Sequence, residues 1–153
     1  MDSVKVRIEG VPVPQGSLDW FGRGKATHQN EDELKAWRRL VALTVRDAMM
    51  QTGMKTAPKG TPISLRVEYH LPRPKHHFSV IDGRVVALVR PSAPALPTVK
   101  PDLDKLTRAI GDALSGVAYV DDAQIVESST SKWYSPTPNY AFSIIEVRTW
   151  QIS

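Results

Sequence analysis

Two neighbouring stretches decide how this chain is interpreted: residues 100–114 read KPDLDKLTRAIGDAL, and residues 119–126 read YVDDAQIV. The apolar positions of the first stretch recur every three or four residues, which predicts an amphipathic helix over about 102–115. Gly116 is the type of residue that commonly follows the end of a helix. The apolar positions are Leu103, Leu106, Ile110 and Leu114.

Acidic side chains gather around this predicted helix. Asp102 is placed to be its N-cap and Asp104 lies in its first turn, so both carboxylates can approach one point in space. Asp104, Arg108 and Asp112 follow at four-residue steps, and we expect this charged stripe to face solvent. If Asp121–Asp122 is extended chain, only one of the pair can join such a site. Magnesium prefers carboxylate oxygens, but ordinary helix capping and a turn explain the same residues, and spacing leaves both open.

The rest of the chain predicts one domain, 1–153, of the α+β (mixed α/β) class. Alternating residues predict strands, and a run of apolar positions at helical spacing predicts a long helix with Asn30 as its N-cap. We therefore expect a small mixed β-sheet flanked by two main helices, in the order β-α-β-loop-α-β-β. The predicted ranges are strands 4–9, 63–71, 125–133 and 140–150, a loop at 11–30 and a helix at 31–52.

A long segment at about 72–101 interrupts this pattern with prolines and basic residues. A loop of this length in a compact domain is usually functional or disordered, and the sequence leaves both open. Asp82–Gly83 favours a type I′ turn, so a small hairpin is expected inside the segment.

Composition narrows the classes of function. A net charge of +4 and a sequence pI near 9.5 favour anionic partners, nucleic acid first. The chain has no cysteine, which excludes disulfides, thiolate zinc sites and a cysteine nucleophile. We see no signal peptide and no apolar run of membrane-spanning length, so we expect a cytoplasmic protein without a membrane partner.

The acidic segments resemble those of the RusA family of Holliday-junction resolvases. That family has a P/R-D-x-D-N-L-x-K segment, then D-A-L, then D-D-[AS]-Q-[VI], and a lysine on the next strand. The matching residues occur here in the same order within about 32 positions. They are Pro101-Asp102-Leu103-Asp104-Lys105-Leu106-Thr107-Arg108, Asp112-Ala113-Leu114, Asp121-Asp122-Ala123-Gln124-Ile125 and Lys132.

The resemblance implies an Mg²⁺-dependent endodeoxyribonuclease, with Mn²⁺ as a substitute, that resolves four-way DNA junctions in recombination and repair. It implies that Asp102, Asp104 and Asp122 are catalytic carboxylates that bind the metal, with Asp121 as an auxiliary member. Arg108 and Lys132 are the expected basic members of the catalytic site. It also implies a homodimer that places two metal sites across one junction. The basic residues that could contact DNA are Arg23, Lys25, Lys75, Lys100, Lys105, Arg108 and Lys132.

Two positions depart from the family pattern. Lys105 replaces the usual asparagine and adds a cation beside the acidic pair. Arg108 stands where the family often has a catalytic lysine, and since arginine stays protonated we assign it to phosphate binding. The proline-rich segment before Pro101 is similar to phage and prophage branches, as are residues 12–17 and Trp37-Arg38.

Three rival functions stay open. A restriction-like nuclease would need an acidic-x-Lys strand, and the nearest approach here is Glu146-Val147-Arg148. A non-catalytic protein that binds branched DNA would work without metal. A looser flap or branch nuclease would cut a wider range of structures.

Other polar and aromatic side chains carry weaker signals. The pair His76–His77 could bind a transition metal, although adjacent histidines in a polar loop are more often solvated. Trp20–Phe21 lies between loop cations and either stacks on unpaired bases or anchors the loop. His28 and His70 lack a partner motif and are assigned surface or packing roles. Ser17 and Ser79 lie in no motif typical of a serine nucleophile, so nucleophilic catalysis is not expected of them.

Overall fold

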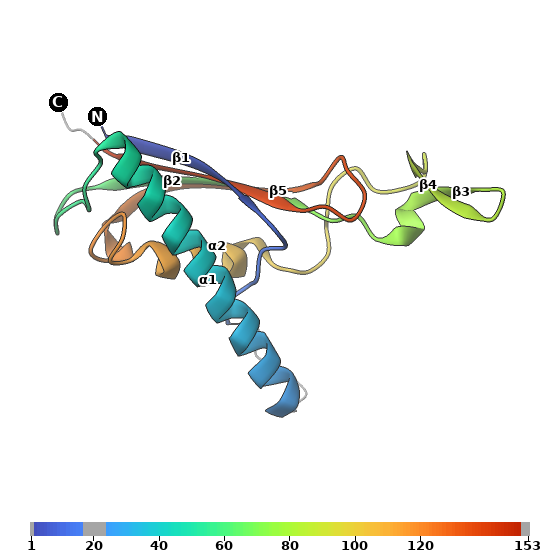
Figure 1. Ribbon diagram of the computed structural model, residues 1–153, viewed down its shortest axis with the longest axis horizontal. Helices are drawn as coiled ribbons and strands as arrows, with labels where there is room; N and C mark the ends of the chain where they lie inside the picture. Colours follow the sequence, from blue (N-terminus) through green and yellow to red (C-terminus); the bar gives the residue numbers. More distant parts are fainter. Residues whose placement is uncertain (1, 17–23, 151–153) are drawn as a thin grey trace.

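The computed structural model describes residues 2–16 and 24–150, with residues 24–29 described by their backbone. A four-stranded sheet carries both long helices on one face, and a hairpin projects from one end (Figure 1). The predicted α+β class and element order are confirmed. The elements are β1 Ser3–Glu9, α1 Gly24–Thr52, β2 Ile63–Leu71, the 3-10 turn η1 Lys75–His77, β3 Phe78–Ile81, β4 Arg84–Val89, α2 Leu103–Leu114, the 3-10 turn η2 Asp122–Gln124, β5 Ile125–Tyr134 and β6 Phe142–Thr149.

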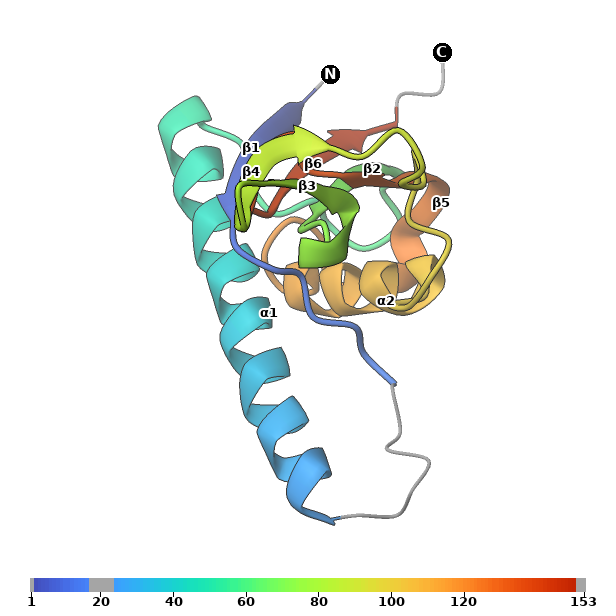
Figure 2. The same ribbon diagram turned by 90° about the vertical axis from the view of Figure 1, so that its right-hand side faces the viewer.

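The sheet is mixed and has the order β1-β6-β2-β5. β6 pairs antiparallel with both β1 and β2, whereas β2 pairs parallel with β5. Alternate residues of β1 and β2 are buried, as expected for strands with one covered face. Figure 2 shows α1 and α2 on the same side of this sheet, with its opposite face uncovered by helices.

The long helix begins earlier than the sequence predicts. α1 begins at Gly24, so Asn30 lies inside the helix and is not its N-cap. Extending an existing helix costs far less than nucleating one, and residues such as Lys25, Ala26 and Gln29 favour the extension. The predicted end is confirmed, since α1 ends at Thr52 and Gly53 follows with a positive φ of 76°. Over the described ranges, no helix is long and apolar enough to cross a membrane.

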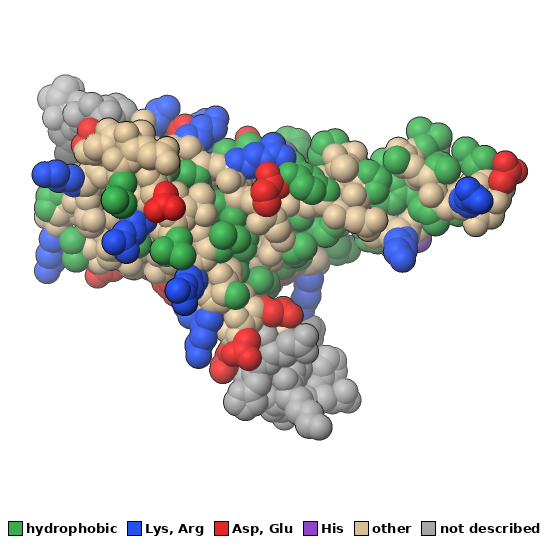
Figure 3. All heavy atoms as spheres, viewed as in Figure 1, with side chains coloured by type: hydrophobic (Ala, Val, Ile, Leu, Met, Phe, Trp, Pro, Cys, Tyr) green, Lys and Arg blue, Asp and Glu red, His purple; other side chains and the backbone are tan. Residues whose placement is uncertain are grey.

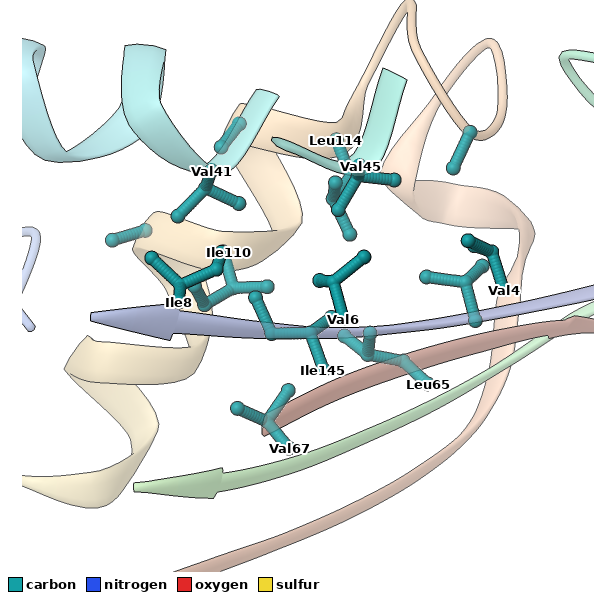
Figure 4. Packing of buried hydrophobic residues seen from close by; sticks show 14 of the residues in the cluster. Val4, Val6, Ile8, Val41, Val45, Leu65, Val67, Ile110, Leu114 and Ile145 are labelled. Atoms are coloured by element: carbon teal, nitrogen blue, oxygen red, sulfur yellow. The ribbon is translucent and has the colours of Figure 1, made fainter. Parts of the chain in front are cut away.

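The core lies between the two helices and the sheet. Val41 and Val45 of α1 and Ile110 of α2 are fully buried against the inner faces of the strands. Figure 4 shows these side chains converging on Val6 and Ile145 from the sheet. The core therefore holds α2, and with it the acidic start of the helix, against the sheet.

Residues 72–101 contain an arm that consists of η1, β3 and β4 and projects from the sheet (Figure 1). β3 and β4 form the predicted hairpin, and both turn residues, Asp82 and Gly83, have the positive φ that a type I′ turn requires. Figure 3 shows hydrophobic side chains gathered along this projecting arm. The exposed apolar residues of the hairpin are Val80, Ile81, Val85, Leu88 and Val89.

Candidate functional site

The start of α2 presents two exposed carboxylates. Asp102 occupies the N-cap position with an extended backbone, but its side chain makes no capping hydrogen bond. Its carboxylate instead lies 3.6 Å from the Lys105 ammonium, an exposed pair of the kind that contributes little to stability. Asp104 makes no hydrogen bond or ion pair with the parts of the chain that the structure describes. A capping hydrogen bond therefore does not account for Asp102, whereas Asp104 lies in the first turn, where a carboxylate complements the helix dipole.

The Asp121–Asp122 pair is held in a tight turn rather than in extended chain. Asp121 is the N-cap of η2, and its carboxylate accepts a hydrogen bond from the Ala123 N–H at 3.1 Å. This bond lowers the pKa of Asp121. A hydrogen bond between the two carboxyl groups, together with some burial, raises the pKa of Asp122. The condition for side chains on opposite faces, a continuous extended chain, is not met here because Asp122 begins a 3-10 turn.

Gln124 anchors this turn to the domain. Its buried amide oxygen accepts hydrogen bonds from the Val120 and Asp121 N–H groups at 2.8 and 3.0 Å. Its amide nitrogen donates to the carbonyl oxygens of Pro58 and Thr61 at 2.9 and 3.1 Å. One buried side chain thus joins the acidic turn to the segment between α1 and β2.

Asp122 packs against the third turn of α2. A methyl group at Gly111 would lie 4.0 Å from the Asp122 Cβ, so the two backbones approach closely. The buried Tyr119 hydroxyl donates to the Gly111 carbonyl at 2.7 Å. Burial raises the pKa of Tyr119, and the charges of Asp122 and Asp112 raise it further. Gly111 and Asp104 lie on one stripe of the helix, separated along its axis by roughly 10 Å at ~1.5 Å per residue.

A loop from the end of β1 closes the other side of this stripe. The Gln15 N–H donates to the Lys105 carbonyl at 3.0 Å, and the Gln15 side chain donates to the Asp112 carboxylate. Arg38 of α1 in turn donates to the Gln15 amide oxygen at 3.1 Å. Asp112 is therefore half-buried, and not part of a fully exposed stripe as the sequence predicts.

Arg108 lies between Asp104 and this loop. It is exposed, and a Cβ at Gly16 would come within 3.0 Å of its Nη1 atom. Gly16 also has a φ of 79°, a conformation that residues with a side chain rarely adopt. The glycine thus leaves room for the guanidinium beside the acidic stripe.

Lys132 supports the entry to α2. It lies on β5, paired with the buried Tyr69 of β2, and so on the helix-bearing face of the sheet. Its ammonium donates to the carbonyl oxygens of Val99 and Pro101 at 2.9 and 3.0 Å. These bonds fasten the chain immediately before Asp102.

Comparison with known proteins assigns these features to a family. The pattern of the family described as endodeoxyribonuclease RusA matches residues 9–145. The chain belongs to the RusA family. It is also 30% identical over 148 residues to the uncharacterized protein YqaN of Bacillus subtilis (strain 168), covering 96% of this chain and 99% of that protein.

The three carboxylates that match the RusA family pattern, Asp102, Asp104 and Asp122, do not all lie at one point. Asp102 and Asp104 lie at one end of the α2 stripe and Asp122 lies beside the other end. Among the side chains that the structure describes, no group of three acidic or histidine residues is close enough to hold a cation by direct contacts. A site shared by Asp102, Asp104 and Asp122 stays a prediction.

The remaining basic candidates are spread over the molecule. Lys75 begins η1 at the base of the arm, and Lys100 lies two positions before the N-cap of α2. Arg23 and the side chain of Lys25 lie outside the described residues. So do the pair Trp20–Phe21 and the side chains of Ser17 and His28.

Two histidine assignments can be compared with the structure. His77 is buried and its ring lies edge-on to Tyr134, while its Nδ1 is 3.2 Å from Arg73. The pKa of His77 is lowered by burial and by the neighbouring His76 and Arg73. The expectation that both His76 and His77 are solvated is therefore wrong for His77, because this residue packs at the base of the arm. The packing role of His70 is confirmed by its stack on Phe142.

Sequence reasoning missed the supporting residues of the site. No pattern in the sequence assigned a role to these residues, which are Gln15, Arg38, Gly111, Tyr119 and Gln124. A glycine in the middle of a helix, which costs about 1 kcal/mol relative to alanine, was the available signal for Gly111. The contacts of the others depend on segments that are distant in the sequence.

Proposed function

We propose that this protein is an Mg²⁺-dependent endodeoxyribonuclease that cleaves four-way DNA junctions by phosphodiester hydrolysis. The observation that carries the proposal is the α2 stripe of a RusA-family chain, with exposed Asp104 at its start and Asp122 packed beside it at Gly111. The net charge of +4 supports a DNA substrate.

The residues present fit a hard divalent cation. Asp102 and Asp104 offer exposed carboxylates, and the neighbouring Asp121 raises the pKa of Asp122, so a cation bound there would relieve the interaction between two acidic groups. Magnesium keeps several waters when bound, so some of these carboxylates would hold it through a water molecule. When bound, the metal would activate water and neutralise charge on the leaving oxygen.

The chain's own cations complement this chemistry. Arg108 follows Asp104 by one helical turn and is positioned to bind a non-bridging oxygen of the scissile phosphate. Its guanidinium stays protonated, so it stabilises charge and transfers no proton. Lys132 acts as a positioning residue, since its bonds to Val99 and Pro101 hold the approach to Asp102.

A junction-cleavage assay tests the proposal. The wild-type protein, incubated with a synthetic four-way junction, is expected to make paired symmetric nicks with Mg²⁺ and none with EDTA. Asp104→Asn should abolish cleavage while the junction is still bound. Asp47→Asn, which removes an exposed carboxylate from α1, is the matched control and should cut normally.

Other outcomes identify the rival functions. Junction retention without nicks by the wild-type protein would favour a non-catalytic branched-DNA-binding accessory protein. Equal cutting of flaps and junctions would favour a looser branch nuclease. We also propose a homodimer in the cytoplasm, since paired cuts need two sites, and light scattering of the purified protein tests the dimer.

A further inference from the structure

A row of stacked side chains crosses the helix-free face of the sheet. His70 of β2 pairs with Phe142 of β6 on one side and with Trp133 of β5 on the other. The His70 and Phe142 rings are 4.2 Å apart and tilted by 8°, and the His70 and Trp133 rings are 6.5 Å apart and tilted by 17°. The Arg7 guanidinium of β1 lies 3.8 Å from the centre of the Phe142 ring. One near-parallel stack thus spans all four strands.

The two ends of the stack differ. Arg7 is held by Glu9 at 3.0 Å and by the Tyr140 hydroxyl at 3.0 Å, so its end is occupied. Trp133 ends the row on β5, and no strand of the sheet lies beyond β5 in the described structure. Its indole N–H donates to the Ser131 hydroxyl at 2.7 Å, which fixes the ring, yet 43% of the residue is exposed. The stack therefore has an open aromatic end at the edge of the sheet.

This open end and the candidate nuclease site lie on opposite faces of the same edge strand. Trp133 follows Lys132 directly on β5, so the two side chains leave opposite faces of one edge strand. Lys132 holds the carbonyl oxygens that lead into Asp102 and α2. A DNA strand that follows this edge can meet the carboxylates on one face and the Trp133 ring on the other.

We propose that Trp133 stacks on an unpaired base at the branch point of the DNA substrate. Every base has a flat π face, so a fixed and exposed indole recognises unstacked bases without reading their sequence. The inner rings and Arg7 support the indole from behind and hold its plane. The proposal rests on the proposed junction substrate but not on cleavage, because stacking needs no metal.

The test uses the full chain and a four-way junction carrying 2-aminopurine at the branch point, in EDTA so that no strand is cut. Wild-type protein should change the 2-aminopurine fluorescence, and Trp133→Ala should abolish this change and weaken junction binding roughly 5- to 100-fold. Trp133→Phe keeps a ring and should restore most of both signals. Trp150→Ala is the matched control, because Trp150 is also 43% exposed but lies beside Pro62 at the other end of the sheet.

Two results would overturn the proposal: junction binding by Trp133→Ala equal to that of Trp150→Ala, or conversion of a wild-type dimer to monomers by Trp133→Ala. The second result would assign the tryptophan to a protein interface. Binding of a blunt duplex should change less than about twofold in either variant. If wild-type protein binds and stacks but never cuts with Mg²⁺, the proposed nuclease function fails while the role of Trp133 stands.

Discussion

The Gln124→Glu substitution is expected to loosen the turn that carries Asp122. Glutamate has nearly the same shape as glutamine, and its oxygens can still accept from the two N–H groups of the turn. It cannot donate the two hydrogen bonds that the amide makes to Pro58 and Thr61. An ionised carboxylate would instead face two carbonyl oxygens in a buried position.

The expected loss of stability in Gln124→Glu can be worked out from those contacts. Each lost hydrogen bond costs about 1 kcal/mol, and a buried, repelled charge adds about 1–2 kcal/mol. We therefore expect the free energy of unfolding to fall by roughly 3–4 kcal/mol at about pH 8, a large part of the ~5–15 kcal/mol typical of a domain.

The deficit should depend on pH in a defined direction. The new carboxyl group would have a raised pKa in the folded state, above about 4.3 in the unfolded chain. Its protonated form can donate a hydrogen bond, so the loss of stability relative to wild type is smallest at low pH. This loss grows as pH rises through the folded-state pKa of the new carboxyl group. Urea denaturation at about pH 5.5 and pH 8 measures this difference, with the exposed Gln51→Glu as control. A Gln124→Glu protein within about 0.5 kcal/mol of wild type at both values would refute the anchoring role.

Three further outcomes are expected. Lys105→Asn removes the ammonium group that lies 3.6 Å from the Asp102 carboxylate. Because that cation competes with the metal, Mg²⁺ binding measured by calorimetry should tighten about two- to fivefold. Unchanged or weaker binding would contradict this prediction. Gly111→Ala should raise the free energy of unfolding, measured in urea, by about 0.5–1 kcal/mol, because alanine favours a helix and the new methyl group would meet only the Asp122 Cβ at 4.0 Å. A destabilised variant would show that α2 and the Asp122 turn lie closer together than this distance. Since the pKa of Asp122 is raised, protons should compete with Mg²⁺ there, so acidification should weaken Mg²⁺ binding at a higher pH than it would for an ordinary aspartate. The same pH dependence in Asp122→Asn as in wild type would argue against Asp122 as a ligand.

Local sequence signals were sufficient for most of the fold. Alternation in residues 63–71 predicted β2 with its observed bounds, and Asp82–Gly83 predicted the turn between β3 and β4. These features depend on side-chain period and on backbone conformations that few residues adopt, and both are properties of neighbouring residues. The start of α1 was missed because Asn30 has a strong N-cap preference but the preceding residues also favour a helix.

The sequence alone determined which side chains could form the candidate site. It also determined that α2 would begin with Asp102 as its N-cap, because a proline, an N-cap residue and the helical spacing of apolar residues exert their effects within a few positions of one another. Only the tertiary structure decided that Asp122 lies beside Gly111, that Gln124 anchors its turn, and that Trp133 ends a stack begun at Arg7. Such contacts join segments dozens of residues apart, and they form only when burial of the shared core brings the strands and helices together.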